Sequence, residues 1–472
     1  MRIKIIVNVL ILLLFSFSVS AQFTLPGNSV TVIAAPIGSL VPDVFLDNAG
    51  VLHMVYAKNQ NAYYVKSIDN GITFSNPVLI NTSGSVEYNM GERGPKLSVG
   101  NDGVIHVAWM DHWNSGVSVY ARYSRSTNGG LSFEPLKSVS GTPGVDGVTL
   151  AADGNDQVLV FWHTMVPQQT AVPSATWLHY ARSADNGITF SADTNVLFSN
   201  HSGLACSMCM TRARFDADGS VCLAFRSAEN SIRDFYLLKG NPLVNNFEAY
   251  RINIDNWNIN YCPMAGASLE ISNSGKLYSA FMTGNHVYWA VSDTGIPLFT
   301  QHNATPLNEF EEIYPTAVAN NSGLVLFVWQ IGPMSVNDSA IVKWALYNSE
   351  GSFTGQQGVA GKTFSGTKAT AFVGTDDNFY IVANTQNLTS VQDPVESAGL
   401  QIMPNPASDQ IFIPFISNAT ELELFDCFGK LVLKKTVNSS TILTVSNLSQ
   451  GIYILAVRTP LLVFKRKIIV DR

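Results

Sequence analysis

Short apolar runs separated by polar turns recur along the chain, and this pattern predicts β-strands. In residues 101–109, NDGVIHVAW, a polar turn containing glycine leads into an apolar strand that ends in an aromatic residue. Segments of the same kind occupy residues 47–56, 154–162, 216–225, 272–281, 321–329 and, more weakly, 374–383. No long stretch repeats with the period of 3.6 residues that marks an amphipathic helix, so we expect an all-β chain.

These segments define repeated units, each of which begins with a strand of its own. The first strands are expected near Asp43, Lys96, Val148, Arg212, Ala265, Thr316 and Lys368. Most intervals are about 52 residues, and one longer unit contains an insert at residues 166–176. Four short strands per unit at this period are typical of β-propeller blades, which bury their faces against one another in a closed ring. We predict a seven-bladed propeller completed by a strand at residues 29–34. Six blades are the alternative, because the last unit is degraded.

An octet recurs downstream of three of these strands, as SIDNGITF (67–74), STNGGLSF (126–133) and SADNGITF (183–190). Its Ser and Asp side chains are expected to cap backbone donors in a tight turn, and its glycine to supply a positive φ. In the second copy Asn128 replaces the Asp, which a hydrogen-bonding role tolerates and an acid–base role does not. The octets are therefore predicted to be structural.

The octets match the Asp-box, S-x-D-x-G-x-T-F/W, and the repeat resembles the propellers of the sialidase superfamily, in which the motif is also called the BNR repeat. The resemblance implies that the boxes lie at the outer turns between third and fourth strands, away from an active site. The Arg-Ile-Pro motif found early in that family is not visible in this sequence. No catalytic residue is therefore carried over by motif.

The last eighty residues form a different kind of segment. MPNPASDQIFIPF (403–415), ELELFDCFGKLVLKK (421–435) and LTVSNLSQGIYILAVRT (443–459) resemble the Por, or type IX secretion, sorting domain. The resemblance implies a Bacteroidota-type cell, passage through the outer membrane by the type IX secretion machinery, and a product that is released or attached to the cell surface. A small immunoglobulin-like β-sandwich that binds a ligand is the alternative.

The N-terminus, residues 1–21, has a short basic region, an apolar run and small residues at its end, which predicts a secretory signal peptide. A retained N-terminal anchor is the alternative, although the run is short for a membrane span. No other segment is long and apolar enough to span a membrane. The propeller is expected to occupy residues 22–392, and the sorting domain, a small β-sandwich, residues 393–472.

Charge excludes one class of partner. Only 13% of the residues are charged and the net charge is −7, whereas phosphate binding requires concentrated Lys and Arg, so no nucleic-acid partner is expected. The chain also has no nucleotide-binding glycine loop, serine-nucleophile elbow or H-E-x-x-H stretch. Apart from the copper considered below, no cofactor is expected.

Polar and charged side chains recur in the loops that precede the first strands or follow the second, and in a propeller these loops share the ligand face. Sialidases clamp a substrate carboxylate with three arginines and use a Tyr–Glu pair and an Asp for chemistry. The corresponding candidates here are Arg93, Arg212 and Arg226 or Arg233 as clamps, with Tyr314, Glu229 and Asp111. They predict binding of an extracellular glycan or other small anionic ligand, or exo-sialidase-like hydrolysis. The alternative is a set of rim salt bridges without catalysis.

Three cysteines form a more local signal, in LACSMCMTRARF (204–215) and NYCPMAG (260–266). Cys206 and Cys262 both lie 13 residues before the turn glycine of their unit, so they occupy equivalent positions in neighbouring blades. A disulfide among Cys206, Cys209 and Cys262 suits an exported protein. Two alternatives stay open. One is a non-catalytic module that binds a protein partner or a soft metal such as copper(I), with help from Met208, Met210, Met264, His201 or His163; the other is free buried thiols.

Overall fold

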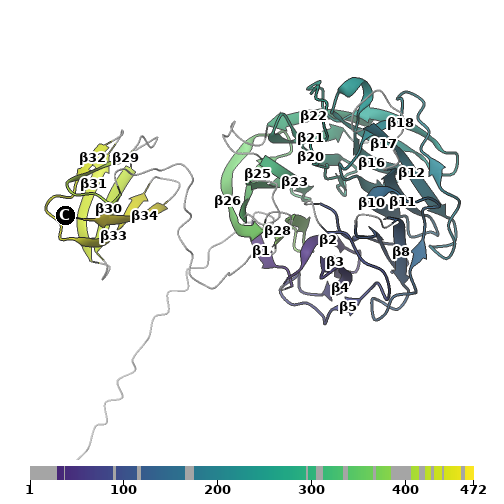
Figure 1. Ribbon diagram of the computed structural model, residues 1–472, viewed down its shortest axis with the longest axis horizontal. Helices are drawn as coiled ribbons and strands as arrows, with labels where there is room; N and C mark the ends of the chain where they lie inside the picture. Colours follow the sequence, from purple (N-terminus) through teal and green to yellow (C-terminus); the bar gives the residue numbers. More distant parts are fainter. Residues whose placement is uncertain are drawn as a thin grey trace, which may run out of the picture. The chain divides into compact units, whose positions relative to one another are not determined.

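The computed structural model describes residues 29–36, 38–88, 92–113, 118–164, 175–293, 296–303, 312–332, 339–364, 368–383, 405–413, 420–426, 430–437, 441–458 and 463–471. The chain divides into two compact units, Met1–Thr385 and Gln386–Arg472, which are described separately (Figure 1). The expected signal peptide, most of the insert at 166–176 and the expected boundary at 392 and 393 lie outside the described residues.

In the described part of the first unit the strands form seven sheets. The first contains β2 (Leu40–Leu46), β3 (Leu52–Lys58), β4 (Asn61–Ser67) and β5 (Val78–Leu79). The second contains β6 (Lys96–Val99), β7 (Ile105–Met110), β8 (Ala121–Ser126) and β9 (Lys137–Ser138). The third contains β10 (Val145–Ala152), β11 (Val158–Thr164), β12 (Ala175–Ser183) and β13 (Thr194–Asn195), with β14 (Leu204–Cys206) also paired to β12.

The remaining sheets continue the same order. The fourth contains β15 (Arg212–Phe215), β16 (Val221–Arg226), β17 (Phe235–Asn241) and β18 (Asn246–Arg251), with the short 3-10 helix η1 (Glu229–Ser231) between β16 and β17. The fifth contains β19 (Glu270–Ile271), β20 (Leu277–Thr283), β21 (His286–Asp293) and β22 (Ile296–Asn303). The sixth contains β23 (Glu312–Ala319), β24 (Leu324–Ile331), β25 (Ser339–Asn348) and β26 (Phe353–Phe364). The seventh contains β27 (Thr370–Val373), β28 (Phe379–Ala383) and β1 (Val30–Ala34).

The sheets are arranged around a common axis, as in a β-propeller (Figure 1). The innermost strands β2, β6, β10 and β15 contact one another in sequence, β23 contacts β27, and β27 contacts β2. The number of sheets equals the number of first strands expected from the sequence. The strand expected at residues 29–34 is present as β1, which pairs in parallel with β28 from Val30 opposite Phe379 to Ala34 opposite Ala383. Chain segments from both ends of the unit thus share its seventh sheet.

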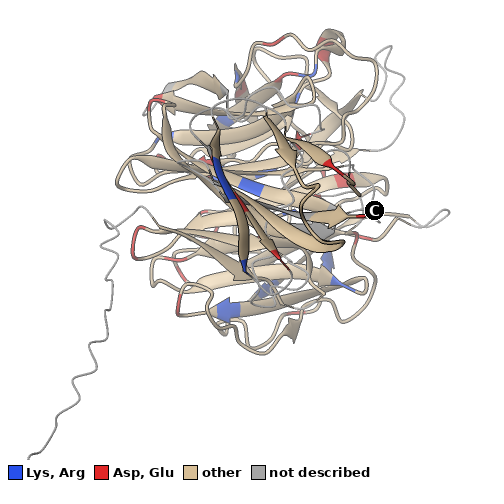
Figure 2. Cartoon of the chain, turned by 90° about the vertical axis from the view of Figure 1, so that its left-hand side faces the viewer, with Lys and Arg blue, Asp and Glu red and all other residues tan. Residues whose placement is uncertain are grey.

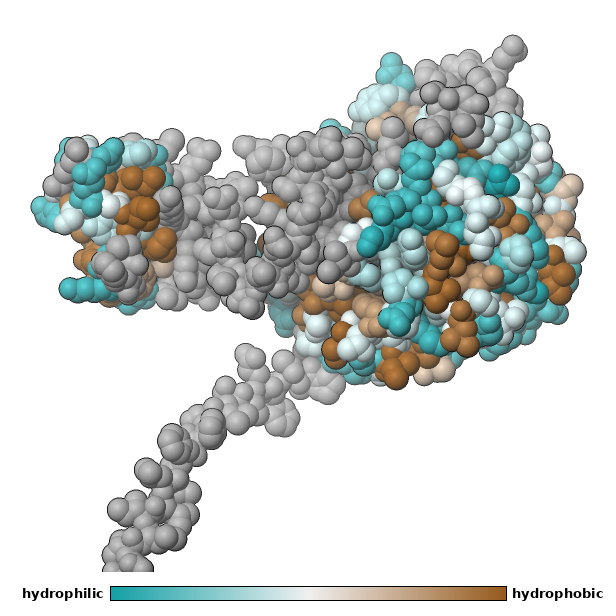
Figure 3. Space-filling view, turned by 60° about the horizontal axis from the view of Figure 1, so that its bottom comes forward, coloured by the Kyte–Doolittle hydropathy of each residue, from teal (hydrophilic) through white to brown (hydrophobic). Residues whose placement is uncertain are grey.

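Apolar side chains that alternate along the strands fill the spaces between neighbouring sheets. Between the first two sheets, for example, Val55 and Tyr64 pack with Val107 and Trp109. Hydrophilic and hydrophobic residues are intermingled on the surface. Figure 2 shows few Lys, Arg, Asp and Glu residues, scattered rather than gathered, and on the face drawn in Figure 3 hydrophilic residues interrupt the hydrophobic ones.

Each octet forms the turn between the third and fourth strands of its sheet, the place that the resemblance implies. In the first octet the Ser67 hydroxyl accepts a hydrogen bond from the Gly71 N–H (2.8 Å) and donates one to Asp69 (2.6 Å). Gly71 has a φ of +86° and Gly187 of +80°. A Cβ at Gly187 would collide with the Tyr123 hydroxyl at 1.8 Å, so packing as well as φ requires glycine there.

The second unit is a small all-β body. β29 (Gln410–Ile413) pairs with β32 (Thr441–Thr444), and a second sheet has the order β31 (Leu431–Val437), β30 (Thr420–Asp426), β33 (Gly451–Arg458) and β34 (Val463–Val470). Its apolar core includes Ile411, Leu422, Leu455 and Ile468. Across the described stretches of both units, no helix has the length and apolarity needed to span a membrane.

Candidate functional site

The face on which the innermost strands begin, here called the upper face, carries most of the expected site residues. Arg93 precedes β6 and forms a buried, two-point ion pair with Asp146 of β10, with Nε at 2.6 Å from Oδ1 and Nη2 at 2.5 Å from Oδ2. Burial alone would lower the pKa of Arg93, but the adjacent Asp146 carboxylate raises it above its usual value. The guanidinium is therefore held between two neighbouring sheets by a protein carboxylate.

Arg212 begins β15 and forms an ion pair with Asp43 of β2, in a sheet that is not its neighbour in the ring. The other Asp43 oxygen accepts the Leu97 N–H at 2.9 Å. Burial would raise the pKa of Asp43, but the charge of Arg212 lowers it, so this carboxylate is anionic. This pair crosses the axis of the ring.

Arg226 ends β16 and is fully buried. Its guanidinium donates hydrogen bonds to three backbone carbonyls, those of Arg233 (2.8 Å), Ala265 (3.1 Å) and Met282 (2.7 Å). It also lies 4.1 Å from the ring centre of Phe235. Arg233 is equally buried and donates to the Tyr261 carbonyl at 3.2 Å. These two arginines bind the protein's own backbone.

The structure does not bring the candidate arginines together on one carboxylate-binding position, as a sialidase-type clamp requires. Arg93, Arg212 and Arg226 each have a separate internal partner: Asp146, Asp43 and a set of carbonyls. Sequence spacing could not reveal this, because each partner lies on another sheet or another strand of the propeller.

The remaining sialidase-like candidates are also distributed over different sheets. Asp111 follows β7 and forms an ion pair with Arg122 of β8 at 2.8 Å. Glu229 lies in η1 with an oxygen 3.6 Å from Nε2 of His201. Tyr314 is buried in β23 of the sixth sheet at a φ of +52°, within an irregularity of the β23–β24 pairing.

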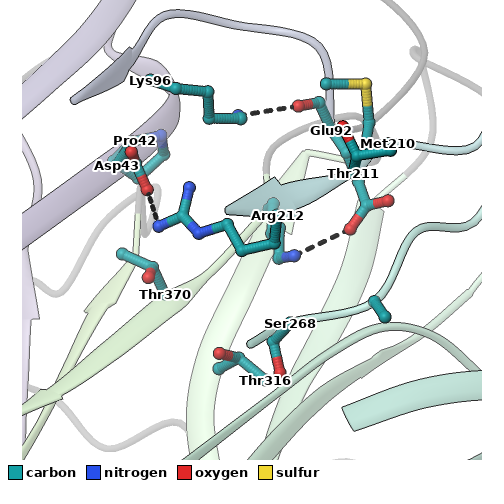
Figure 4. A pocket seen from close by; sticks show the side chains of 12 residues that line it. Pro42, Asp43, Glu92, Lys96, Met210, Thr211, Arg212, Ser268, Thr316 and Thr370 are labelled. Atoms are coloured by element: carbon teal, nitrogen blue, oxygen red, sulfur yellow. Dashed lines mark hydrogen bonds and ion pairs between the residues drawn. The ribbon is translucent and has the colours of Figure 1, made fainter. Parts of the chain in front are cut away.

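A small cavity lies where the first strands converge, with a volume of about 40 Å³ (Figure 4). Five charged side chains line it: Asp43, Glu92, Lys96, Arg212 and Lys368. The hydroxyl-bearing residues Thr211, Ser268, Thr316 and Thr370 line it as well. Glu92, Lys96 and Lys368 were not predicted as site residues, although the expected first strands near 96 and 368 marked two of these positions.

The three predicted cysteines do converge. The sulfur of Cys209 lies 3.5 Å from that of Cys206 and 3.4 Å from that of Cys262, and all three sulfurs lie within 4.8 Å of one another. They are free thiols in this structure, with Cys206 and Cys209 fully buried. Cys222 is buried in an apolar core apart from this cluster, and Cys427 lies outside the described residues.

The surroundings of this cysteine cluster are sulfur-rich. Met208 and Met264 pack against it. Both have left-handed backbone conformations, with φ of +62° and +51°, which non-glycine residues rarely adopt. Burial would raise the pKa of Cys209, but its contacts with the sulfurs of Cys206 and Cys262 and the charge of Arg226 lower it well below its usual value. Burial raises the pKa of Cys206. The surroundings thus favour the ionised form at Cys209 and the protonated form at Cys206.

His163 lies beside the cysteine cluster. It is fully buried, and because a carbonyl oxygen only accepts hydrogen bonds, its Nε2–H donates to the Cys209 carbonyl at 2.8 Å. The other ring nitrogen, Nδ1, then carries a lone pair and has no hydrogen-bond partner. The bond to the carbonyl fixes the backbone on which the Cys209 sulfur is mounted.

Comparison with known families identifies the C-terminal unit. Residues 401–471 match the family described as secretion system C-terminal sorting domain. The chain is thus a β-propeller followed by a C-terminal sorting domain, and the match indicates export by type IX secretion to the cell surface or the extracellular space. A search of curated proteins gave no match.

Solved structures with similar folds are distant. The Hadza microbial sialidase Hz136 is 14% identical with a TM-score of 0.42, covering 69% of this chain and 74% of that one. An α-L-arabinanase of Penicillium chrysogenum complexed with arabinobiose is 12% identical with a TM-score of 0.45, covering 68% and 98%. A protein of unknown function from Dyadobacter fermentans is 14% identical with a TM-score of 0.43, covering 64% and 93%.

Proposed function

We propose that this exported propeller binds a soft, thiophilic metal ion at Cys206, Cys209 and Cys262. Copper(I) is the ion that we favour. The observation that carries the proposal is the convergence of three sulfurs within 4.8 Å from two different blades. Thiolate ligands suit copper(I), zinc and iron–sulfur clusters, but thioethers are soft ligands typical of copper(I), and a structural zinc site takes four ligands. Three cysteines beside two methionines therefore favour copper(I) over zinc.

The cluster is held in place before any metal arrives. Cys206 belongs to β14, where it pairs with Ala175 of β12, and His163 fixes the backbone at Cys209. The strained conformations of Met208 and Met264 recur at equivalent places in two blades. Strained backbone persists where the surrounding structure imposes it, and it is common at functional sites. Preorganisation of this kind lowers the cost of binding a metal.

The test is a metal and thiol analysis of the mature protein purified without reductant, with Cys222→Ala as the matched control because Cys222 is a buried cysteine outside the cluster. We expect one copper(I) per chain, resistant to a chromogenic copper(I) chelator, in wild type and Cys222→Ala. Cys209→Ala and Cys262→Ala should hold none. A disulfide between any two of the three cysteines in the purified protein, or three titratable thiols that bind no copper(I), would refute the proposal.

A second candidate is glycan binding on the upper face. It is favoured by two large aromatic side chains exposed there, Trp113 in the loop after β7 (47%) and Tyr261 in the loop before β19 (51%). Exposed aromatic rings offer flat apolar surfaces flanked by polar groups, as ligand sites do. Because the arginines are committed to internal partners, we expect binding without sialoside hydrolysis.

A glycan array with the mature protein, run beside a fluorogenic sialoside assay, tests this candidate. Trp113→Ala and Tyr261→Ala should lose the array signals. Leu243→Ala, which changes an exposed side chain in the β17–β18 turn, should keep them. An array without signals for wild type would reject glycan binding, and turnover of the sialoside would reject the non-hydrolytic form.

A further inference from the structure

The cavity on the propeller axis carries an excess of positive charge. Three cations, Lys96, Arg212 and Lys368, face two carboxylates, Asp43 and Glu92. Arg212 is paired with Asp43, and Lys368 lies 2.7 Å from Glu92. After these two pairs are counted, one positive charge remains, that of the Lys96 ammonium.

Lys96 is buried, and its ammonium donates to a carbonyl oxygen, that of Glu92, at 3.0 Å. The second carboxylate oxygen of Glu92 accepts the Gly266 N–H at 2.5 Å, so both oxygens of this carboxylate are engaged elsewhere. Arg214 and Glu270, behind Arg212, pair with each other at 3.2 Å and add no net charge. A buried ammonium without a counter-charge is costly, and an anion in the cavity would remove that cost.

The wall across the cavity supplies hydrogen-bond donors. The Ser268 hydroxyl accepts the N–H groups of Ala280 (3.0 Å) and Ala317 (3.4 Å), so its own hydrogen is left for an acceptor. Thr316 and Thr370 also line the cavity (Figure 4). A volume of about 40 Å³ accommodates a small ion or a few water molecules, since one water needs roughly 10–15 Å³ by the same measure.

We propose that the axial cavity is a binding site for a small monovalent inorganic anion, chloride in extracellular fluid, held by Lys96 and Arg212 and by the Ser268 hydroxyl. One negative charge neutralises the cluster, and the hydroxyls replace part of the ion's hydration. The site is independent of the cysteine cluster and does not rest on the proposed copper binding.

The experiment is thermal unfolding of the mature full chain while chloride replaces gluconate at constant ionic strength. Chloride that binds the folded state raises the midpoint in a saturable way. Lys96→Met should weaken the chloride affinity by about tenfold or more, because it removes the uncompensated charge. Lys276→Met, which removes a lysine from the β19–β20 turn, should leave the response intact.

Thr316→Val serves as a second variant in case Lys96→Met does not fold, since it removes one hydroxyl of the cavity at nearly constant shape, and it should weaken the response. Line broadening in chloride NMR measures chloride binding directly. It should be the same in wild type and in Cys209→Ala, because the anion site is independent of the cysteine cluster. Equal midpoints in chloride and gluconate, or a response unchanged in both cavity variants, would overturn the proposal.

Discussion

Asp69 shows how a side chain with catalytic appearance can be structural. It accepts hydrogen bonds from the Ser67 hydroxyl, the Thr73 N–H (2.9 Å) and the Thr73 hydroxyl (2.6 Å), all within its own octet. In the second octet Asn128 accepts the same bonds from Ser126 and the Ser132 N–H, and its amide donates to the Ser132 hydroxyl at 2.8 Å. The amide thus reproduces the turn without a charge.

The two octets that contain an Asp, at residues 69 and 185, should make the propeller sensitive to acid. Hydrogen bonds from Ser67 and Thr73 lower the pKa of Asp69 to about 2, below its usual 3.8. The pKa of Asp185 is also about 2; burial would raise it, but Thr189 and Ser183 lower it. A depressed folded pKa contributes stability that is present above pH 3.8 and lost as pH falls towards 2.

We therefore expect the melting temperature of the Asp69→Asn, Asp185→Asn double variant to fall less steeply than that of wild type between pH 4 and pH 2. The reverse change, Asn128→Asp, should steepen the decline by adding a third carboxylate of the same kind. Thermal melts followed by circular dichroism at a series of pH values measure both. Parallel curves for all three proteins would contradict the lowered pKa values of Asp69 and Asp185.

Arg226 should behave as a structural residue. A buried guanidinium that donates to three carbonyls cannot be replaced by the single ammonium of lysine, which leaves carbonyls unpaired. We expect Arg226→Lys to lose about 3 kcal/mol of unfolding free energy in urea titrations. Arg182→Lys, at a partly exposed position where Nε bonds to Gln157, should lose less than about 1 kcal/mol. An Arg226→Lys protein of full stability would show that Arg226 is not needed for folding.

At the scale of the element, local pattern sufficed for most of the fold. Apolar alternation and turn glycines depend on near neighbours, so the strands, the repeat and the closing strand β1 could be predicted. The cysteine cluster was predictable because Cys206 and Cys262 hold equivalent positions in adjacent repeats. The arginine partners were not, because Arg212 and Asp43 lie 169 residues apart and meet only through ring closure.

Strand β1 closes the ring, and one of its side chains is well suited to test that role. Ile33 is 6% exposed and packs with Leu52 and Phe372, which come from the first and seventh sheets. Ile33→Ala should destabilise the propeller by about 2–5 kcal/mol in denaturant titrations. Ile72→Ala, where the side chain is 76% exposed, should change stability by about 0.5 kcal/mol or less. Equal effects of the two substitutions would mean that β1 does not secure the ring.

At the scale of the whole propeller, the axial charges connect sheets that are not neighbours. Asp43 and Arg212 join the first and fourth sheets, and Glu92, just before β6, joins Lys368, just before β27. Their contribution must be weighed against the cost of burying Lys96 beside them. The pH dependence of stability measures the cost of burying Lys96, because burial shifts the pKa of its ammonium.

Burial lowers the pKa of Lys96 from 10.5 to about 8, although Asp43 and Glu92 raise it; Arg212 and Lys368 lower it further. Between these pH values Lys96 binds a proton more often in the unfolded chain than in the folded chain, so its contribution to the free energy of unfolding rises with pH. At 1.36 kcal/mol per pKa unit the rise amounts to about 3 kcal/mol.

Urea titrations in chloride-free buffer should show the free energy of unfolding of wild type and of Lys276→Met rising by this amount relative to that of Lys96→Met. Adding chloride should move its onset to higher pH, since a bound anion favours the ammonium. A wild-type profile that runs parallel to that of Lys96→Met would mean that the axial lysine is solvated and that no uncompensated charge exists for an anion to neutralise.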